Sequence, residues 1–236
     1  WRSGWLWSGG SQVSNQLVSV DVSQKGKPKL LNSLTFGKAH ETVRGSIFDK
    51  KRQVVYAITA IQRDPLYVLS FRTPDKLKIL SAVDGLSGDI NLFRPIEGGQ
   101  FLLAVGRDDS ASCTGFGTDR RSWGSRTAVS IIDVRNLRKI RLVQRKCINI
   151  KSRGWSFSSV NSNRDQAHKM VGLFQDGKTN LITVPVNFYI PPKDSKVWWY
   201  QLRSLVGMMR WNLNNYDPTK NEKEQTVLEN LGTIEH

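Results

Sequence analysis

Three stretches of the chain repeat one pattern, in which a strand-like segment is followed by a short polar break and then by a second, basic and apolar segment. The paired segments are residues 17–22 and 28–31, residues 66–71 and 77–80, and residues 129–134 and 140–143. In every copy, the second segment begins seven residues after a polar residue, which is Asp21, Ser70 or Asp133. A chain that repeats one strand pair in this way is constrained to fold as an array of similar β-sheets.

The spacing of the copies indicates which kind of array to expect. Self-similarity at a period of about 40 to 70 residues, built from short β-patterned segments, is typical of a β-propeller. Each of the first two units has room for four strands separated by turn residues, and four antiparallel strands make one propeller blade. No segment shows a sustained helical period, so we expect few helices. The predicted fold is an all-β propeller segment in a single domain, residues 1–236, with about three and a half four-stranded blades. The predicted blades are residues 16–62, 63–109, 128–186 and, in part, 197–236, with an insertion loop at residues 110–127.

The start of the sequence fits either a processed mature chain or an excerpt from a longer protein, and its far end favours the excerpt. The chain opens on Trp1 without the charged start and apolar core of a signal peptide, and residues 228–236 read like the first strand of a further unit. About three and a half blades cannot close a ring, and an open stack of sheets leaves edges that pair promiscuously. We therefore expect a larger ring, or an assembly that covers these edges.

Composition narrows the class of protein further. A chain of 236 residues can bury a real core, and 39% hydrophobic residues with eight Trp suit short strands carrying large loops. No apolar run approaches the roughly 18 to 20 residues that a membrane-spanning helix needs, so no transmembrane segment is predicted.

The net charge of +15 is concentrated in one region. Between Arg120 and Arg153 there are eleven Lys and Arg residues and a single acid, Asp133. If residues 140–150 form a regular strand, Arg141 and Arg145 share one face, which could meet an acidic protein surface or an acidic polysaccharide. A generally basic, soluble surface explains the same run, and nucleic acid is disfavoured because no recognition motif is present. The predicted partner-binding face consists of Arg120, Arg121, Arg126, Arg138, Lys139, Arg141, Arg145 and Lys146.

The aromatic residues offer a second candidate contact surface. Adjacent Trp198 and Trp199 must place their rings on opposite faces if they lie in a strand, so one of them contacts another blade or a partner. Trp beside Arg can stack on sugars or anchor an interface, although packing between blades is the commoner use. The predicted aromatic contacts are Trp198, Trp199 and Trp211.

Cys113 and Cys147 are the two cysteines of the chain. A disulfide between them would close a loop of about 35 residues and stabilise the fold by roughly 3 to 4 kcal/mol in the chain-entropy model. The alternative is two unrelated thiols in a reducing compartment. We predict the disulfide, because Cys113 lies in an insertion rich in Gly and Ser.

Metal and catalytic patterns are weak. Asp108 and Asp109 are candidate calcium ligands, but no twelve-residue calcium loop surrounds them, and a turn explains them as well. The three histidines lack a metal-ligand spacing, and His168 with Asp165 and an upstream serine lacks the Gly-x-Ser-x-Gly elbow of a hydrolase triad. We therefore expect no cofactor and no enzymatic activity.

Several runs of the sequence together resemble a known family. The first is Val18-Ser19-Val20-Asp21-Val22-Ser23 followed by Lys27-Pro28-Lys29-Leu30-Leu31, and the most recognisable is Glu41-Thr42-Val43-Arg44-Gly45-Ser46-Ile47-Phe48. Further matching runs are residues 103–108, 130–134, 167–169 and 181–186. Over residues 17–186 the chain resembles bacterial exported β-propellers that are distantly related to the WD-repeat proteins. It departs from their pattern at residues 70–73, in the basic third blade and in the Trp-rich end.

The resemblance implies export, to the periplasm, the outer surface or the extracellular space, and a non-catalytic role. The favoured hypothesis is an interaction or scaffold module, a subunit of a bacterial envelope or surface complex, whose partners are other protein subunits with acidic surfaces. A carbohydrate- or polyanion-binding propeller is the alternative, and a propeller hydrolase is the third hypothesis.

Overall fold

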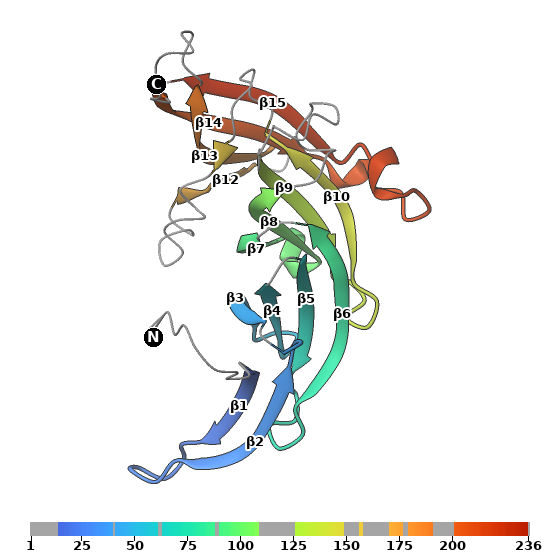
Figure 1. Cartoon of the computed structure of the whole chain (residues 1–236). Coiled ribbons are helices and arrows are strands. Elements are labelled where there is room, and N and C mark those ends of the chain that lie inside the picture. Colours follow the sequence, from blue (N-terminus) through green and yellow to red (C-terminus); the bar gives the residue numbers. More distant parts are fainter. Residues whose placement is uncertain are drawn as a thin grey trace.

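The structure, a computed structural model, is an open arc of four antiparallel β-sheets (Figure 1). It describes residues 14–39, 41–60, 63–87, 90–108, 126–148, 156–157, 170–176, 179–190 and 201–235. We name the sheets A to D in chain order. Sheet A pairs β1 (Asn15–Asp21) with β2 (Lys29–Phe36). Sheet B has the strand order β3 (Thr42–Asp49), β4 (Val54–Ala60), β5 (Arg63–Ser70) and β6 (Lys78–Ser87).

Sheets C and D continue the arc. Sheet C has the order β7 (Ile90–Ile96), β8 (Phe101–Asp108), β9 (Arg126–Asp133) and β10 (Arg141–Cys147). Sheet D has the order β11 (Ser156–Phe157), β13 (Asn180–Ile190), β14 (Gln201–Trp211) and β15 (Leu228–Glu235), and β12 (Gly172–Gln175) also pairs with β13. The described 3-10 turns are η1 (Glu97–Gly99), η3 (Leu213–Asn215) and η4 (Glu222–Glu224). The predicted all-β propeller architecture is confirmed.

The sheets group the strands differently from the predicted blades. The predicted first blade, residues 16–62, is divided, because β1 and β2 form sheet A while β3 and β4 belong to sheet B. The repeated strand pair is the last hairpin of sheets B and C, namely β5–β6 and β9–β10, and it is the whole of sheet A, β1–β2. Units that begin at this pair therefore combine two strands of one sheet with two strands of the next. Residues 228–235 form β15 and pair with β14, which completes sheet D instead of beginning a further unit.

Adjacent sheets pack face to face and bury three separate apolar clusters. Phe36, Val55 and Leu69 belong to the cluster between sheets A and B, and Tyr56, Leu102 and Ile132 to the cluster between sheets B and C. The cluster between sheets C and D is the largest and includes Val129, Ile182 and Trp211. Every residue of β9 is buried, because sheet C has a neighbouring sheet on each face and its central strands are covered on both sides.

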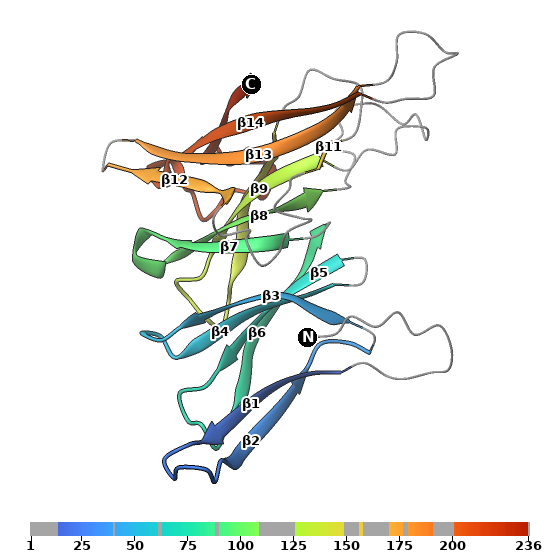
Figure 2. The same ribbon diagram turned by 90° about the vertical axis from the view of Figure 1, so that its left-hand side faces the viewer.

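The hairpin turns of successive sheets lie on one side of the arc. Figure 2, which views the molecule from the open side of the arc, shows the turns β1–β2, β3–β4 and β7–β8 together at the left. Strands that are far apart in the sequence therefore present their turns side by side. Three such turns, β3–β4, β5–β6 and β9–β10, line the candidate site.

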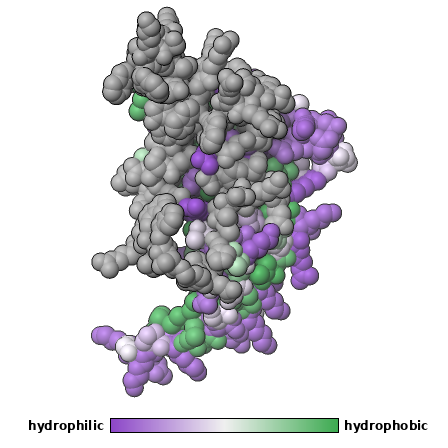
Figure 3. All heavy atoms as spheres, viewed as in Figure 1, coloured by the Kyte–Doolittle hydropathy of each residue, from purple (hydrophilic) through white to green (hydrophobic). Residues whose placement is uncertain are grey.

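The surface is hydrophilic along the convex side, and a patch of hydrophobic residues lies among hydrophilic ones near the lower end of the arc (Figure 3). On β1 and β2, Val18, Val20 and Leu30 are exposed. No helix among the described residues has the length and hydropathy to cross a membrane.

Candidate functional site

A cleft of about 650 Å³ opens between the turns of sheets B and C. Three turns form it: the β3–β4 turn at residues 50–53, the β5–β6 turn at residues 71–77 and the β9–β10 turn at residues 134–140. We call it the basic cleft, because seven of the described residues that line it are Lys or Arg, and none of the described lining residues is Asp or Glu. The cations are Lys51, Arg52, Arg72, Lys76, Lys78, Arg135 and Arg138.

Arg52 joins the two walls of the basic cleft. Its Nη1 donates to Gly99 O at 3.2 Å, and its Nη2 donates to Arg135 O at 2.9 Å, so one guanidinium of sheet B holds two turns of sheet C. Nη1 also donates to the hydroxyl of Tyr56 at 3.1 Å. Burial raises the pKa of Tyr56, which keeps this hydroxyl neutral.

Arg135 is the cation of the basic cleft that has a carboxylate partner. Its Nη2 lies 2.8 Å from Asp133 Oδ2 and its Nε lies 3.0 Å from Asp133 Oδ1. The Tyr216 hydroxyl donates to the same carboxylate at 2.9 Å. Partial burial alone would raise the pKa of Asp133, but the hydrogen bonds from Arg135 and Tyr216 hold it below its usual value. This hydrogen-bonded group links the cleft to the β14–β15 connection, in which Tyr216 lies.

The other five cations carry uncompensated charge. Arg72, Lys76, Lys78 and Arg138 are exposed, as is Lys51. Their side chains have no ion pair or hydrogen bond with any residue that the structure describes, although all five line one cleft. Like charges held this close raise the local positive potential and attract anions.

The backbone of the turns fixes where these side chains begin. In the β3–β4 turn, Asp49 Oδ1 accepts from Arg52 N at 3.0 Å, and Gln53 has a positive φ of 56°. In the β9–β10 turn, Asn136 Oδ1 accepts from Arg138 N at 3.0 Å. Ser81 on β6 donates to Leu137 O at 2.7 Å and so ties this turn to sheet B. The cations are therefore flexible side chains on a fixed frame, which suits binding of phosphate, sulfate or carboxylate groups.

The predicted basic face is only partly assembled. Arg138 lines the basic cleft, while Arg120 and Arg121 lie outside the described residues. Arg126 is 6% exposed, and the side chain of Arg145 is 6% exposed and pairs with Asp108 at 3.3 Å, so neither belongs to an exposed face. The prediction assumed a regular strand over residues 140–150.

A β-bulge in β10 explains why that assumption fails. Leu142 pairs with Ile132 and Gln144 pairs with Ile131, so Val143 is an extra residue. One extra residue reverses the alternation of side chains and separates the faces of Arg141 and Arg145. The Arg141 guanidinium lies 5.1 Å from the Tyr216 ring and donates to Pro218 O at 2.7 Å. Lys139 is exposed and Lys146 is half-buried, and neither lines the cleft.

The remaining candidates are placed as follows. Trp211 is 1% exposed and packs in the core between sheets C and D, so it offers no exposed ring to a partner. Asp108, a calcium candidate, is ion-paired with Arg145 instead. Cys147 is disulfide-bonded. The other predicted residues, Trp198, Trp199, Cys113, Asp109 and the three histidines, lie outside the described residues, so the Cys113–Cys147 pairing stays a prediction.

Sequence reasoning missed the cations from sheet B, although a signal was present. Counted from the polar residue of each repeat, a cation recurs six places on, at Lys27, Lys76 and Lys139. Another recurs eight places on, at Lys29, Lys78 and Arg141. Aligning the repeats, instead of counting charge along the chain, would have indicated a basic rim shared by several turns.

Comparisons with known proteins agree with this architecture. The model of the β-propeller domain family matches residues 7–232. No curated protein and no solved structure matches the chain. Because the family model covers nearly the whole sequence and the structure has the stacked antiparallel sheets of propeller blades, the chain belongs to the β-propeller domain family.

Proposed function

We propose that this chain is a non-enzymatic interaction module that docks an acidic surface of a partner protein into the basic cleft. The observation that carries the proposal is the set of five cations in one cleft, contributed by three turns of two sheets, whose side chains have no partner among the described residues. Holding them together costs electrostatic free energy in the free protein, and an acidic partner relieves that cost. An acidic polysaccharide is the second candidate, because sulfate and carboxylate groups satisfy the same cations.

Export to an oxidising compartment, as a subunit of a bacterial envelope or surface complex, is part of this proposal. The disulfide bond of Cys147 supports it, since disulfides persist outside the reducing cytosol. Peptide mapping of native protein without reductant should recover Cys113 linked to Cys147. Two thiols that alkylate freely would remove this support.

The cleft is tested by comparing two variants of equal net charge. In the cleft variant, Lys51, Arg72, Lys76, Lys78 and Arg138 are changed to Gln. In the control variant, five exposed lysines outside the cleft are changed to Gln: Lys25, Lys27, Lys29, Lys220 and Lys223. Binding of a fluorescein-labelled polyglutamate peptide is followed by anisotropy, with heparin as the polysaccharide probe.

We expect the cleft variant to lose at least about a hundredfold in affinity for polyglutamate, since several charge-assisted contacts are removed together. The control variant should lose far less. Equal losses in the two variants would show attraction to net charge alone and contradict the proposal. Stronger binding of heparin than of polyglutamate would select the second candidate, and chemical change of the recovered probe would contradict a non-enzymatic role.

A further inference from the structure

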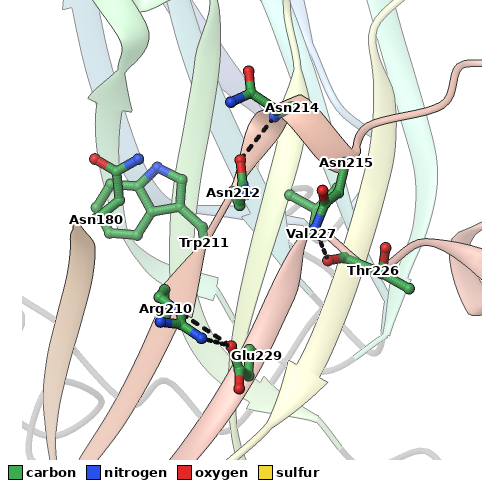
Figure 4. Close-up of a pocket in the computed structure, with 9 residues that line it drawn as sticks. All are labelled: Asn180, Arg210, Trp211, Asn212, Asn214, Asn215, Thr226, Val227 and Glu229. Carbon is green, nitrogen blue, oxygen red and sulfur yellow. Dashed lines mark hydrogen bonds and ion pairs between the residues drawn. The ribbon is translucent and has the colours of Figure 1, made fainter. Parts of the chain in front are cut away.

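A second pocket, of about 400 Å³, lies at one end of sheet D. It is formed where β13 begins, where β14 ends, and by the connection from β14 to β15 (Figure 4). Its volume is near the lower limit of the range of about 300 to 1,000 Å³ that small-molecule sites occupy. We call it the amide pocket, because four of its nine lining residues are asparagines: Asn180, Asn212, Asn214 and Asn215.

Several amide groups of this pocket are not used by the protein. Asn212 Oδ1 accepts a hydrogen bond from Asn214 N at 3.0 Å, and Asn215 Nδ2 donates one to Thr226 O at 3.2 Å. The other polar atom of each amide, Asn212 Nδ2 and Asn215 Oδ1, makes no hydrogen bond with a described residue. The side chains of Asn180 and Asn214 have no hydrogen bond with any described residue. These amides therefore offer both hydrogen-bond donors and hydrogen-bond acceptors, and the amide groups are uncharged.

The charges in the amide pocket compensate each other. Arg210 on β14 donates to Glu229 on β15 from Nε at 2.9 Å and also from Nη2. Figure 4 shows this pair at one side of the pocket, with the amides of Asn212 and Asn214 at the other. Because the two charges cancel, the amide pocket has no net charge that would attract an ion, whereas the basic cleft is positively charged.

Trp211 forms the wall of the pocket beside Asn180 (Figure 4). Leu181 pairs with Arg210 across β13 and β14, so Asn180 and Trp211 are the next residues of the two strands. The indole is 1% exposed, and its Nε1 is a buried donor with no hydrogen-bond partner among the described residues. An unsatisfied buried donor is costly, and it is satisfied when a neighbouring oxygen turns toward it. Asn180 is adjacent to the Leu181–Arg210 pair and lies beside Trp211 (Figure 4), so its amide is the side chain that we expect to supply that oxygen when a ligand is bound.

We propose that the amide pocket binds a neutral saccharide. A sugar hydroxyl donates and accepts at one atom, which matches side-chain amides that offer both groups. Trp211 and Val227 are the only apolar side chains among the nine described residues that line the pocket, so a lipid or an apolar peptide would find little surface to bury there. The site is separate from the basic cleft, because the two share no lining residue.

The proposal is tested by calorimetric titration of the whole chain with four uncharged probes: maltotetraose, cellotetraose, mannotetraose and chitotetraose. Saturable binding of at least one is expected. The variant Asn180→Ala/Asn214→Ala removes the two unused side chains and breaks no described side-chain hydrogen bond, so it should fold. It should weaken binding by about tenfold or more.

Gln24→Ala is the matched control, because it removes an exposed amide on the β1–β2 turn, outside the pocket. Its affinity should equal that of the unchanged chain. As a second readout, the indole N–H resonance of Trp211 should shift in proton–nitrogen correlation spectra when the saccharide is added. The proposal is overturned if none of the four probes binds saturably, or if the double variant binds as tightly as the control.

Discussion

The basic cleft and the amide pocket both lie where strands turn, but they treat charge in opposite ways. In the cleft, five cations face one cavity without a carboxylate among the described residues, whereas in the pocket Arg210 is paired with Glu229. The pocket is lined by amides that need neither a counter-ion nor a change in protonation. The contrast teaches that a net charge of +15 is not spread evenly over the molecule, and that local pairing decides which surface attracts anions.

Salt should separate the two sites by the largest margin. Raising NaCl from 0.1 to 1 M shortens the screening length from about 10 Å to about 3 Å, so polyglutamate affinity should fall by about a hundredfold or more. Saccharide affinity should stay unchanged, because no net charge is involved. Titrations of both probes over this range measure the difference. If the saccharide affinity of the pocket fell with salt as steeply as the polyglutamate affinity of the cleft, the two sites would not differ in their use of charge.

Asp133→Asn should have the next largest effect, because Asp133 holds both Arg135 of the cleft and Tyr216 beside the pocket. Loss of hydrogen bonds to a charged, buried group should lower the free energy of unfolding by about 1 to 3 kcal/mol at pH 7. The pKa of Asp133 is lowered in the folded protein, so its stabilisation is present above the unfolded value of 3.8 and is lost as pH falls through the folded value. Urea unfolding of both proteins from pH 7 to pH 3 measures this.

The stability difference between the two proteins should shrink only below about pH 4, the ordinary pKa of an Asp side chain. A difference that stays constant with pH would assign the effect of the substitution to packing. A change in affinity at one site and not the other would show that Asp133 does not couple them.

Much of the fold could be predicted from the residues themselves. The three repeated segment pairs were predicted as strands, and they fall on the hairpins β1–β2, β5–β6 and β9–β10. Alternating apolar residues and turn chemistry are local signals, so they reveal strands directly. Which strands share a sheet depends on pairing between distant segments. The repeat alone does not indicate at which strand one sheet ends and the next begins.

The candidate site was harder to predict for two physical reasons. Arg145 was assigned to an exposed face because a bulge at Val143 cannot be seen in an alternating pattern. The cleft joins turns of different sheets, so Lys51 and Arg138 meet only once the sheets are stacked. Among the described residues of the predicted face, Arg138 is the one that lines the cleft, and it lies in the β9–β10 turn.

Glu229→Gln should have the smallest effect. Both members of the Arg210–Glu229 pair are about half exposed, at 50% and 55%, so its removal should change the free energy of unfolding by less than about 1 kcal/mol. The pocket would gain an unpaired cation, and polyglutamate affinity should rise by no more than about fivefold. Thermal unfolding and the anisotropy titration measure both values. A rise comparable to the loss in the cleft variant would mean that one cation suffices to make an anion site here.

The sizes of the three apolar clusters also predict the order in which the sheets of the arc unfold. They contain 18 described buried residues between sheets C and D, 12 between sheets B and C, and five between sheets A and B. Because the described residues of each sheet pack against those of the neighbouring sheets, we expect the molecule to behave like a one-dimensional chain of coupled units whose stability is a sum of interface terms. We expect sheet A, which has the smallest interface, to unfold first. Sheets C and D, which share the largest interface, should stay folded longest.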